Sequence, residues 1–399
     1  MKKDVKFATK VIHAGQKPCE ATGAIMPPIY TTSTYKQKEP GSHQGYEYSR
    51  AQNPTRQAYE KCIAELESGT HGFAFASGLA AIDAIINLLN PNDHVLAVDD
   101  LYGGTYRLFT KIRQNKNQLN FNFIDFSNVN NILKNINKNT RMIWLESPTN
   151  PLLKIIDLKS VIKIIQEYNS KNRNENNKII TVLDNPFATP YLQRPLELGF
   201  DIVMHSATKY LNGHADIIGG VVVVDANKNL SIKENIEFHQ FAIGGIQGPF
   251  DSYLVLRGLK TLELRMQRQC ENAMYLAENL KNNKVIKKIY YPGLKNHKNY
   301  EVAKKQMNGY FGGIISIELA CNFELVKKFI NNLEIFTLAE SLGGVESLIN
   351  HPAIMTHATV PKDILDTSGI TMSFLRLSIG IEDRDDLLQD LIYSLNKIN

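Results

Sequence analysis

Short apolar runs alternate with stretches of helical spacing through the middle of the chain. Apolar residues three and four positions apart predict helices over residues 56–67 and 78–89. Short apolar runs predict strands at residues 94–99, 121–124, 142–146, 179–183, 202–204 and 220–224. Strands that alternate with helices indicate an α/β fold with a mostly parallel sheet, covered by helices on both faces.

The pattern changes at both ends of the chain. A long run of helical spacing extends from Pro249 to Leu280, and shorter helical and extended patterns follow it. This favours a second, α+β domain at the C-terminus. The first 50 or so residues are rich in Pro, Thr, Ser and Tyr and lack sustained periodicity. We expect an arm there that becomes ordered against another surface, such as a neighbouring subunit.

Composition narrows the class of protein. The 399 residues are 43% apolar, which is enough for a large core and two domains. No run approaches 18 apolar residues and no apolar segment follows the basic start, so neither a membrane span nor a secretory signal is expected. The four scattered cysteines argue against a zinc site or a disulfide framework, and we expect a cytoplasmic protein. The charge of +5 is spread along the chain, which is typical of solvation and not of nucleic-acid binding.

The most informative residue is Lys209, which follows a predicted strand. A lysine there is a candidate covalent catalyst, and the nearby hydroxyls of Ser206 and Thr208 could bind a phosphate. Asp184 ends the preceding strand and could fix a cation on the same edge, because ligands gather at the carboxyl ends of strands in α/β folds. These parts together suit pyridoxal 5'-phosphate (PLP). The alternative is a surface lysine in an ordinary turn.

Other segments supply further candidate ligands. Gly78 and Leu79 begin a predicted helix, whose free N–H groups favour a phosphate, although a Ser-Gly pair is also common as a simple helix cap. Arg50 could add a forked donor. Tyr102 follows a strand and could stack on a planar cofactor, and Arg376 lies in an apolar strand. A buried arginine needs a partner, which is either a substrate carboxylate or a structural ion pair.

In this order the residues resemble the Cys/Met-metabolism family of fold-type I PLP enzymes, with most similarity to cystathionine gamma-lyases and gamma-synthases. The motifs that carry the resemblance lie at residues 27–30, 46–50, 146–151, 206–213 and 340–347. The resemblance implies a mostly parallel seven-stranded sheet with helices on both faces, a smaller α+β C-terminal domain and an N-terminal arm. The implied bounds are 1–56 for the arm, 57–247 for the PLP-binding domain and 248–399 for the C-terminal domain.

The same resemblance implies roles for the cofactor-binding residues. Lys209 would link covalently to PLP and move protons, Asp184 would hold the pyridinium nitrogen, and Tyr102 would stack on the ring and protonate the leaving group. The phosphate would be bound by the four residues Gly78, Leu79, Ser206 and Thr208. Two further residues would reach the phosphate and substrate of the adjacent subunit, namely Tyr48 and Arg50. The active sites would therefore be shared within a homotetramer built as a dimer of dimers.

On the substrate side, the resemblance implies that Arg376 clamps the α-carboxylate of an amino-acid substrate with help from Asn150 and the Ser341 backbone. Arg107 and Glu340 would lie near the distal end of the substrate. No metal is implied.

The implied reaction is α,γ-elimination of L-cystathionine to cysteine, 2-oxobutyrate and ammonia, which is a step of transsulfuration, with a side activity on cysteine that releases hydrogen sulfide. Alternatives within the family are a cystathionine gamma-synthase, a cystathionine beta-lyase and a methionine gamma-lyase. Methionine gamma-lyases typically carry cysteine at the position of Gly104 and an apolar residue at that of Glu340. One departure from the family is Pro186, which removes an N–H donor after Asn185.

Other classes fit less well. The run Gly258 to Thr261 resembles the end of a P-loop, but the required upstream glycine is Tyr253. His351 and His357 are six residues apart and have no other ligand at metal-binding spacing, so structural roles are favoured. A non-enzymatic scaffold would be colourless, whereas a PLP protein would be yellow.

Overall fold

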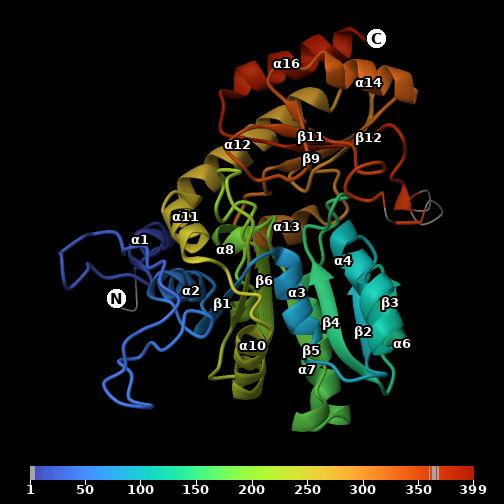
Figure 1. Cartoon of the computed structure of the whole chain (residues 1–399). Helices are drawn as coiled ribbons and strands as arrows, with labels where there is room; N and C mark the ends of the chain where they lie inside the picture. Colours follow the sequence, from blue (N-terminus) through green and yellow to red (C-terminus); the bar gives the residue numbers. More distant parts are fainter. Residues whose placement is uncertain (1–4, 359, 362–364, 366–367) are drawn as a thin grey trace. The chain divides into compact units, whose positions relative to one another are not determined.

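The structure is a computed structural model of the 399-residue chain, and it describes residues 5–358, 360–361, 365 and 368–399 (Figure 1). Its contacts divide the chain into two compact units. The first comprises Met1–Asn90, Ile180–Pro186 and Arg194–Glu263, and the second comprises Pro91–Ile179, Phe187–Gln193 and Leu264–Asn399. The domain bounds expected from the sequence follow a different division and stay a prediction.

Seven strands are ordered β1-β7-β6-β5-β4-β2-β3, and the first four belong to the first unit. Their bounds are β1 (His71–Phe75), β5 (Ile180–Asp184), β6 (Ile202–Ser206) and β7 (Gly220–Val224). β5 and β6 are parallel, whereas β7 is antiparallel to both of its neighbours. The helices of this unit are α1 (Phe7–His13), α2 (Pro54–Leu66), α3 (Gly78–Ile86), α9 (Pro195–Leu198), α10 (Leu230–Ile243) and α11 (Pro249–Leu259).

Local chemistry explains where the helices of the first unit begin. The Asn53 side chain accepts hydrogen bonds from the N–H groups of Thr55 and Arg56, and Pro54 occupies the first turn of α2. Ser77 caps α3 by accepting from the Ala80 N–H. Both helices bury one apolar face, and every residue of β7 is buried.

The second unit contains the other three strands of that order and a sheet of its own. β2 (His94–Val98) is parallel to both β3 (Asn120–Ile124) and β4 (Thr140–Glu146). The helical segments around these strands are α4 (Gly103–Arg107), η1 (Leu108–Arg113), α5 (Gln114–Asn117), α6 (Asn130–Asn135), α7 (Leu158–Asn172), η2 (Glu175–Asn177) and α8 (Thr189–Leu192).

A five-stranded sheet ordered β10-β11-β12-β9-β8 forms the C-terminal part of the second unit (Figure 1). Its strands are β8 (Ile286–Tyr290), β9 (Ile314–Leu319), β10 (Thr337–Leu338), β11 (Leu348–Asn350) and β12 (Phe374–Ser378). All residues of β9 and β12 are buried. The helices of this part are α12 (Leu262–Leu280), α13 (Tyr300–Gln306), α14 (Phe323–Asn331) and α16 (Arg384–Asn396).

The α/β fold class, the mostly parallel seven-stranded sheet and all six predicted strands of the middle segment are confirmed. The expectation of one long helical run from Pro249 to Leu280 was wrong in one respect, because α11 ends at Leu259 and α12 begins at Leu262. The intervening turn is closed by i to i−3 hydrogen bonds from Lys260 N to Arg257 O and from Thr261 N to Gly258 O.

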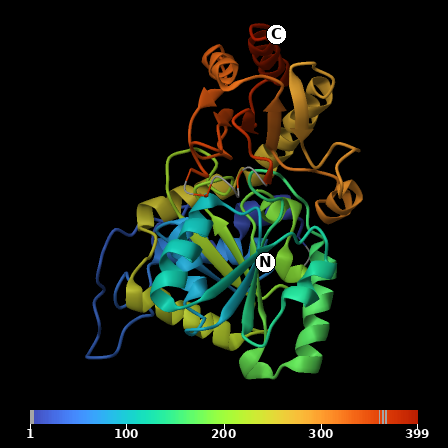
Figure 2. The same ribbon diagram turned by 90° about the vertical axis from the view of Figure 1, so that its right-hand side faces the viewer.

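The N-terminal segment has little regular structure, as predicted. Figures 1 and 2 show it in blue as an extended chain between α1 and α2. Two isolated antiparallel bridges occur in it, between Thr34 and Tyr48 and between Glu39 and Ser42. In the part of the chain that is described, no helix has the length and apolar character needed to cross a membrane.

Candidate active site

The predicted phosphate ligands of the first unit gather where three backbone segments meet. β6 ends at Ser206, which pairs with Gly220 at the start of β7. A Cβ on Gly220 would lie 2.3 Å from the Ser77 carbonyl oxygen. A Cβ on Gly78 would lie 3.2 Å from the Cβ of Ser206. The two glycines therefore allow the first turn of α3 to lie directly beside the end of β6. Gly78 and Leu79 open α3, so their N–H groups lie at the positive end of its dipole.

Thr208 has a second role that its sequence context did not show. Its Oγ1 donates to the Gly219 carbonyl at 3.3 Å and accepts from the Gly219 N–H at 3.0 Å. The hydroxyl thus fixes the segment that leads into β7. The Thr208 hydroxyl can still donate to a phosphate if its hydrogen rotates away from the Gly219 carbonyl.

Lys209 lies three residues beyond the end of β6, in the turn that the sequence predicted. Its N–H donates to the Ser206 carbonyl at 3.2 Å, and its own carbonyl accepts from the Gly213 N–H at 2.8 Å. These main-chain bonds hold the lysine at a fixed place beyond the strand end, and its side chain is half-buried.

Asp184 ends β5 and is buried, with 5% of its surface exposed. Its Oδ1 has no hydrogen-bond partner among the described residues. Burial raises the pKa of Asp184 from 3.8 to about 7. A buried carboxyl without a protein donor is suited to a positively charged donor supplied by a ligand, and a protonated pyridine nitrogen is such a group.

A buried pair of an acidic and a basic side chain lies near the ends of β5 and β6. The sequence did not reveal it. His205 Nε2 lies 2.5 Å from Glu67 Oε1, and both side chains are fully buried. Asn185, next to Asp184, donates its side-chain N–H to the same Glu67 oxygen at 3.2 Å, and its main-chain N–H bonds to Met204 O at 2.9 Å. The end of β5 is therefore anchored through Asn185, ahead of the unusual Pro186.

The second unit contains the predicted carboxylate clamp. Arg376 lies in β12 and is 1% exposed. Its Nη1 donates to Asn150 Oδ1 at 3.1 Å, and its Nη2 donates to the Ser341 carbonyl at 2.8 Å. Ser341 has a φ of +83°, a strained conformation that costs a residue other than glycine about 1–3 kcal/mol. The structure thus brings Arg376, Asn150 and Ser341 together. Ser341 is the strained residue of the three.

His357 also belongs to this cluster, although the sequence favoured only a structural role for it. His357 Nε2 lies 3.1 Å from the Asn150 carbonyl oxygen, and the ring is 3% exposed. Burial and the nearby Arg376 charge lower the pKa of His357 to about 4. Its partner is 207 residues away in the chain, so no local signal could have found this contact.

Tyr102 lies immediately before α4, with its ring partly exposed. Its N–H donates to Glu146 Oε2 at 3.0 Å, which ties the residue to the end of β4. A Cβ on Gly104 would lie 2.4 Å from Cε1 of the Tyr102 ring. Glycine at position 104 therefore leaves the space that the ring occupies, and a cysteine there would displace it.

The two residues predicted to lie near the distal end of the substrate are both exposed. Arg107 is the last residue of α4, and Glu340 precedes Ser341 of the clamp. Chain connectivity places Glu340 beside the carboxylate clamp, which suits a role near a bound amino acid. The roles of both residues stay predictions.

Tyr48 and Arg50 lie in the N-terminal arm. Arg50 Nη1 donates to the Phe241 carbonyl at 2.9 Å, and its guanidinium lies 4.8 Å from the centroid of the Phe241 ring. Tyr48 is exposed. Within one chain Arg50 is thus held against α10, and its predicted role in an adjacent subunit stays a prediction.

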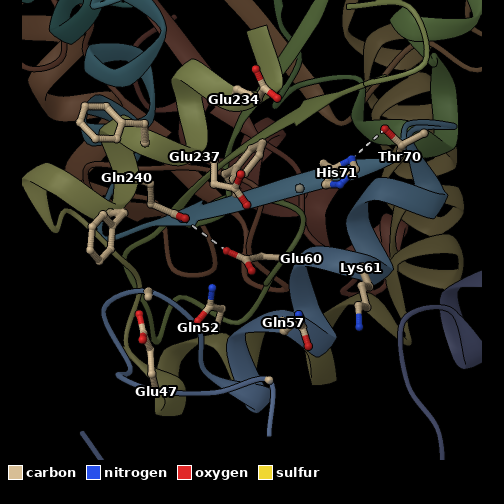
Figure 3. A pocket seen from close by; sticks show the side chains of 16 residues that line it. Glu47, Gln52, Gln57, Glu60, Lys61, Thr70, His71, Glu234, Glu237 and Gln240 are labelled. Carbon is tan, nitrogen blue, oxygen red and sulfur yellow. Dashed lines mark hydrogen bonds between the residues drawn. The ribbon is translucent and has the colours of Figure 1, made fainter. Parts of the chain in front are cut away.

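A pocket of about 660 Å³ in the first unit is distinct from these clusters (Figure 3). None of the predicted site residues lines it. Four glutamates face it, namely Glu47, Glu60, Glu234 and Glu237. Burial raises the pKa of Glu60, and the charge of Glu237 adds to that effect. This concentration of carboxylates is unsuitable for an anionic cofactor such as PLP.

The cluster in the first unit fits PLP by its own chemistry. The buried carboxyl of Asp184 suits the ring nitrogen, and the lysine that such cofactors require follows β6. The start of α3, beside Ser206, suits the phosphate. In the described residues, no three His, Cys, Asp or Glu side chains form a group that could hold a metal ion.

Fold and site together define a PLP-dependent enzyme of fold type I. The chain belongs to the Cys/Met metabolism PLP-dependent enzymes, whose family model matches residues 8–396. It is a carbon–sulfur lyase that requires PLP.

Relatives of this chain carry the names of several reactions. The cystathionine beta-lyase of Coxiella burnetii is 59% identical over 383 residues, which cover 96% of each chain. The crystal structure of a cystathionine gamma-lyase from Lactobacillus plantarum, complexed with L-serine, has a TM-score of 0.92 at 43% identity and 99% coverage of both chains. A cystathionine gamma synthase from Xanthomonas oryzae pv. oryzae has a TM-score of 0.93 at 38% identity, also with 99% coverage of both chains. The family is therefore secure, and its member reactions differ.

Proposed function

We propose that this enzyme cleaves L-cystathionine, with α,γ-elimination to cysteine, 2-oxobutyrate and ammonia as its main reaction. The observation that carries the proposal is the buried clamp of Arg376, Asn150 and the Ser341 carbonyl. A buried guanidinium that is oriented by these two oxygen acceptors presents a forked set of N–H donors, which suits the α-carboxylate of an amino acid.

PLP supplies the electron sink that makes the α-proton of a bound amino acid acidic. The side chains of this chain do the remaining work. Lys209 would remove the α-proton at its Nζ and give up a proton in a later step, a role that its fixed main chain just beyond the end of β6 supports. Tyr102 would stack on the cofactor ring and deliver a proton to the departing sulfur. Asp184 would hold the ring nitrogen in its protonated form from its buried position.

The phosphate is bound in this proposal by the N–H groups of Gly78 and Leu79 and the hydroxyls of Ser206 and Thr208. The close approach of Gly78 to Ser206 supports this assignment. Tyr48 and Arg50 complete the site of an adjacent subunit.

Two positions favour cystathionine over methionine as the substrate. Glu340 is exposed beside the clamp and could bind the distal ammonium of cystathionine, a group that methionine lacks. Gly104 leaves room for the Tyr102 ring, whereas a cysteine there would displace it. Arg107 is assigned to the distal carboxylate.

A second candidate reaction is β-elimination of the same substrate. It is favoured by the relative that is 59% identical and is named a cystathionine beta-lyase. β-Elimination would release homocysteine, pyruvate and ammonia. A third candidate is the synthase reaction, in which cysteine replaces the acyl group of an acyl-homoserine, favoured by the synthase of similar structure.

One pair of assays separates the three reactions. The pure enzyme is incubated with L-cystathionine, and separately with an acyl-homoserine plus cysteine. We expect 2-oxobutyrate and cysteine from the first incubation and little cystathionine from the second. Pyruvate and homocysteine would instead establish β-elimination, and efficient cystathionine formation would establish the synthase. Borohydride reduction of the yellow enzyme should leave the cofactor attached to Lys209.

We further propose a homotetramer of two dimers with shared active sites. Several large apolar side chains around α10 and α11 are exposed in the single chain, namely Phe238, Phe241, Ile243 and Phe250. Large exposed apolar side chains on consecutive helices favour subunit contact. Mixing inactive Arg50→Ala and Lys209→Ala chains tests the sharing, because a mixed dimer regains one intact site. About a quarter of wild-type activity is expected from random pairing, and no recovery would refute shared sites.

A further inference from the structure

We propose that His357 is a positioning residue for the substrate's α-carboxylate, acting by holding the main chain of Asn150. The inference rests on the proposed amino-acid substrate and concerns its carboxylate alone. It assigns a role to a residue whose sequence context favoured only packing.

The hydrogen bonds of His357 define its tautomer. Its Nε2 lies 3.1 Å from the Asn150 carbonyl oxygen, which can only accept, so Nε2 carries the hydrogen. In a neutral ring Nδ1 is then the acceptor, and the Thr356 hydroxyl lies 2.8 Å from it. That contact is shorter than the 3.3 Å from the same hydroxyl to Asn350 Oδ1. The imidazole is therefore held on both sides in one orientation.

Asn150 is held at two points as a result. His357 binds its main-chain carbonyl, while Arg376 Nη1 donates to its side-chain Oδ1 at 3.1 Å. Because Oδ1 accepts from the guanidinium, Nδ2 of the same amide remains as the donor of this side chain. Among the described residues, Nδ2 has no hydrogen-bond acceptor. The arrangement presents this amide as a donor for a carboxylate that also pairs with Arg376.

The charge of the ring also suits this role. Burial lowers the pKa of His357 to about 4, and the Arg376 charge acts in the same direction. The backbone carbonyls of Asn150 and Leu101 have the opposite effect and raise this pKa. The ring is thus a neutral donor at neutral pH. A second cation beside Arg376 would repel the guanidinium, whereas a neutral imidazole fixes Asn150 without that cost.

The backbone around His357 is equally constrained. Its N–H donates to the Pro352 carbonyl at 2.9 Å. A Cβ on Gly103 would lie 2.4 Å from the Thr356 carbonyl oxygen, so the start of α4 lies directly against this segment. Gly103 follows Tyr102, and the histidine is therefore fixed beside the residue proposed to protonate the leaving group.

The test compares two ligands that differ by one carboxylate, L-serine and ethanolamine. Their affinities for the PLP-loaded enzyme are measured by the change in absorbance of the bound cofactor. His357→Phe keeps a ring but removes the donor, and we expect it to weaken L-serine about tenfold, as loss of roughly one hydrogen bond implies. Ethanolamine affinity should change less than about twofold, well under the tenfold that 1.4 kcal/mol represents. His357→Gln, whose amide can donate, should recover most of the affinity for L-serine.

His351→Leu is the matched control. This histidine is also buried, but its Nε2 lies 3.0 Å from the Met372 carbonyl, and no hydrogen bond joins it to Asn150 or Arg376 among the described side chains. We expect it to change both ligand affinities equally or not at all. In turnover, His357→Phe should raise KM more than it lowers kcat.

Equal weakening of both ligands by His357→Phe would overturn the proposal, as would unchanged affinity for L-serine. If that variant does not fold, His357→Ala provides the same comparison. The affinity measurements with L-serine and ethanolamine do not use cystathionine. Failure of the proposed lyase reaction and failure of the positioning role are therefore distinguishable.

Discussion

Replacing Asp184 by Asn tests whether the protein keeps a destabilising carboxyl for its cofactor. Burial raises the pKa of this group from 3.8 to about 7, a difference of about three pKa units. At 1.36 kcal/mol per unit, holding the charged carboxylate in the cofactor-free protein costs about 4 kcal/mol. Asn has nearly the same shape and no charge, so Asp184→Asn should stabilise the cofactor-free enzyme at neutral pH.

The sign of the pH dependence follows from the raised pKa. The folded chain binds the Asp184 proton more tightly than the unfolded chain, so stability is lost as the pH rises from about 4 through about 7. The advantage of Asp184→Asn should therefore be near zero at pH 4 and reach about 4 kcal/mol above pH 7.

Urea denaturation of both cofactor-free proteins at several pH values measures this difference. The same titration with PLP bound is the control, because a protonated ring nitrogen gives Asp184 its missing partner and should remove the advantage of Asn. The variant should also bind PLP more weakly. A difference in denaturation midpoint that is constant with pH, or that persists with PLP bound, would refute the reasoning.

Three further changes test packing and charge. Glu67→Ala leaves His205 buried without its partner and should destabilise the enzyme by about 3–5 kcal/mol; an unchanged denaturation midpoint would contradict the importance of the pair. Gly220→Ala places a Cβ 2.3 Å from the Ser77 carbonyl and should weaken PLP binding, measured by titration of the cofactor-free enzyme, whereas wild-type affinity would argue against the proposed phosphate site. Burial raises the pKa of Asp100 to about 6, so the wild type should lose stability relative to Asp100→Asn between about pH 4 and pH 6. A stability difference that does not change over this range would rule that out.

Much of the fold could be predicted because the strands carry local signals. The apolar run at Gly220–Val224 and the similar run at Ile202–Ser206 are both strands with the expected bounds, within two residues. The turn at Lys260 and Thr261 was missed because neither residue is a helix breaker, and helical spacing continues across it.

The candidate site was predicted unevenly. Lys209 and Asp184 follow from their positions at strand ends, where ligands gather in α/β sheets. The Glu67–His205 pair was missed, because its members are 138 residues apart in the chain. Such pairs arise only when distant elements pack together.

The sequence was sufficient to predict the six middle strands, the helices α2 and α3, the cofactor and the family, because periodicity and motifs are local properties of a chain. Folding set the properties on which the chemistry depends. Burial without a donor raises the pKa of Asp184, and contacts over long sequence separations fix the tautomer of His357 and the orientation of the Asn150 amide. Proton affinity and hydrogen-bond direction depend on the neighbours in space, and the chain acquires those neighbours only when it folds.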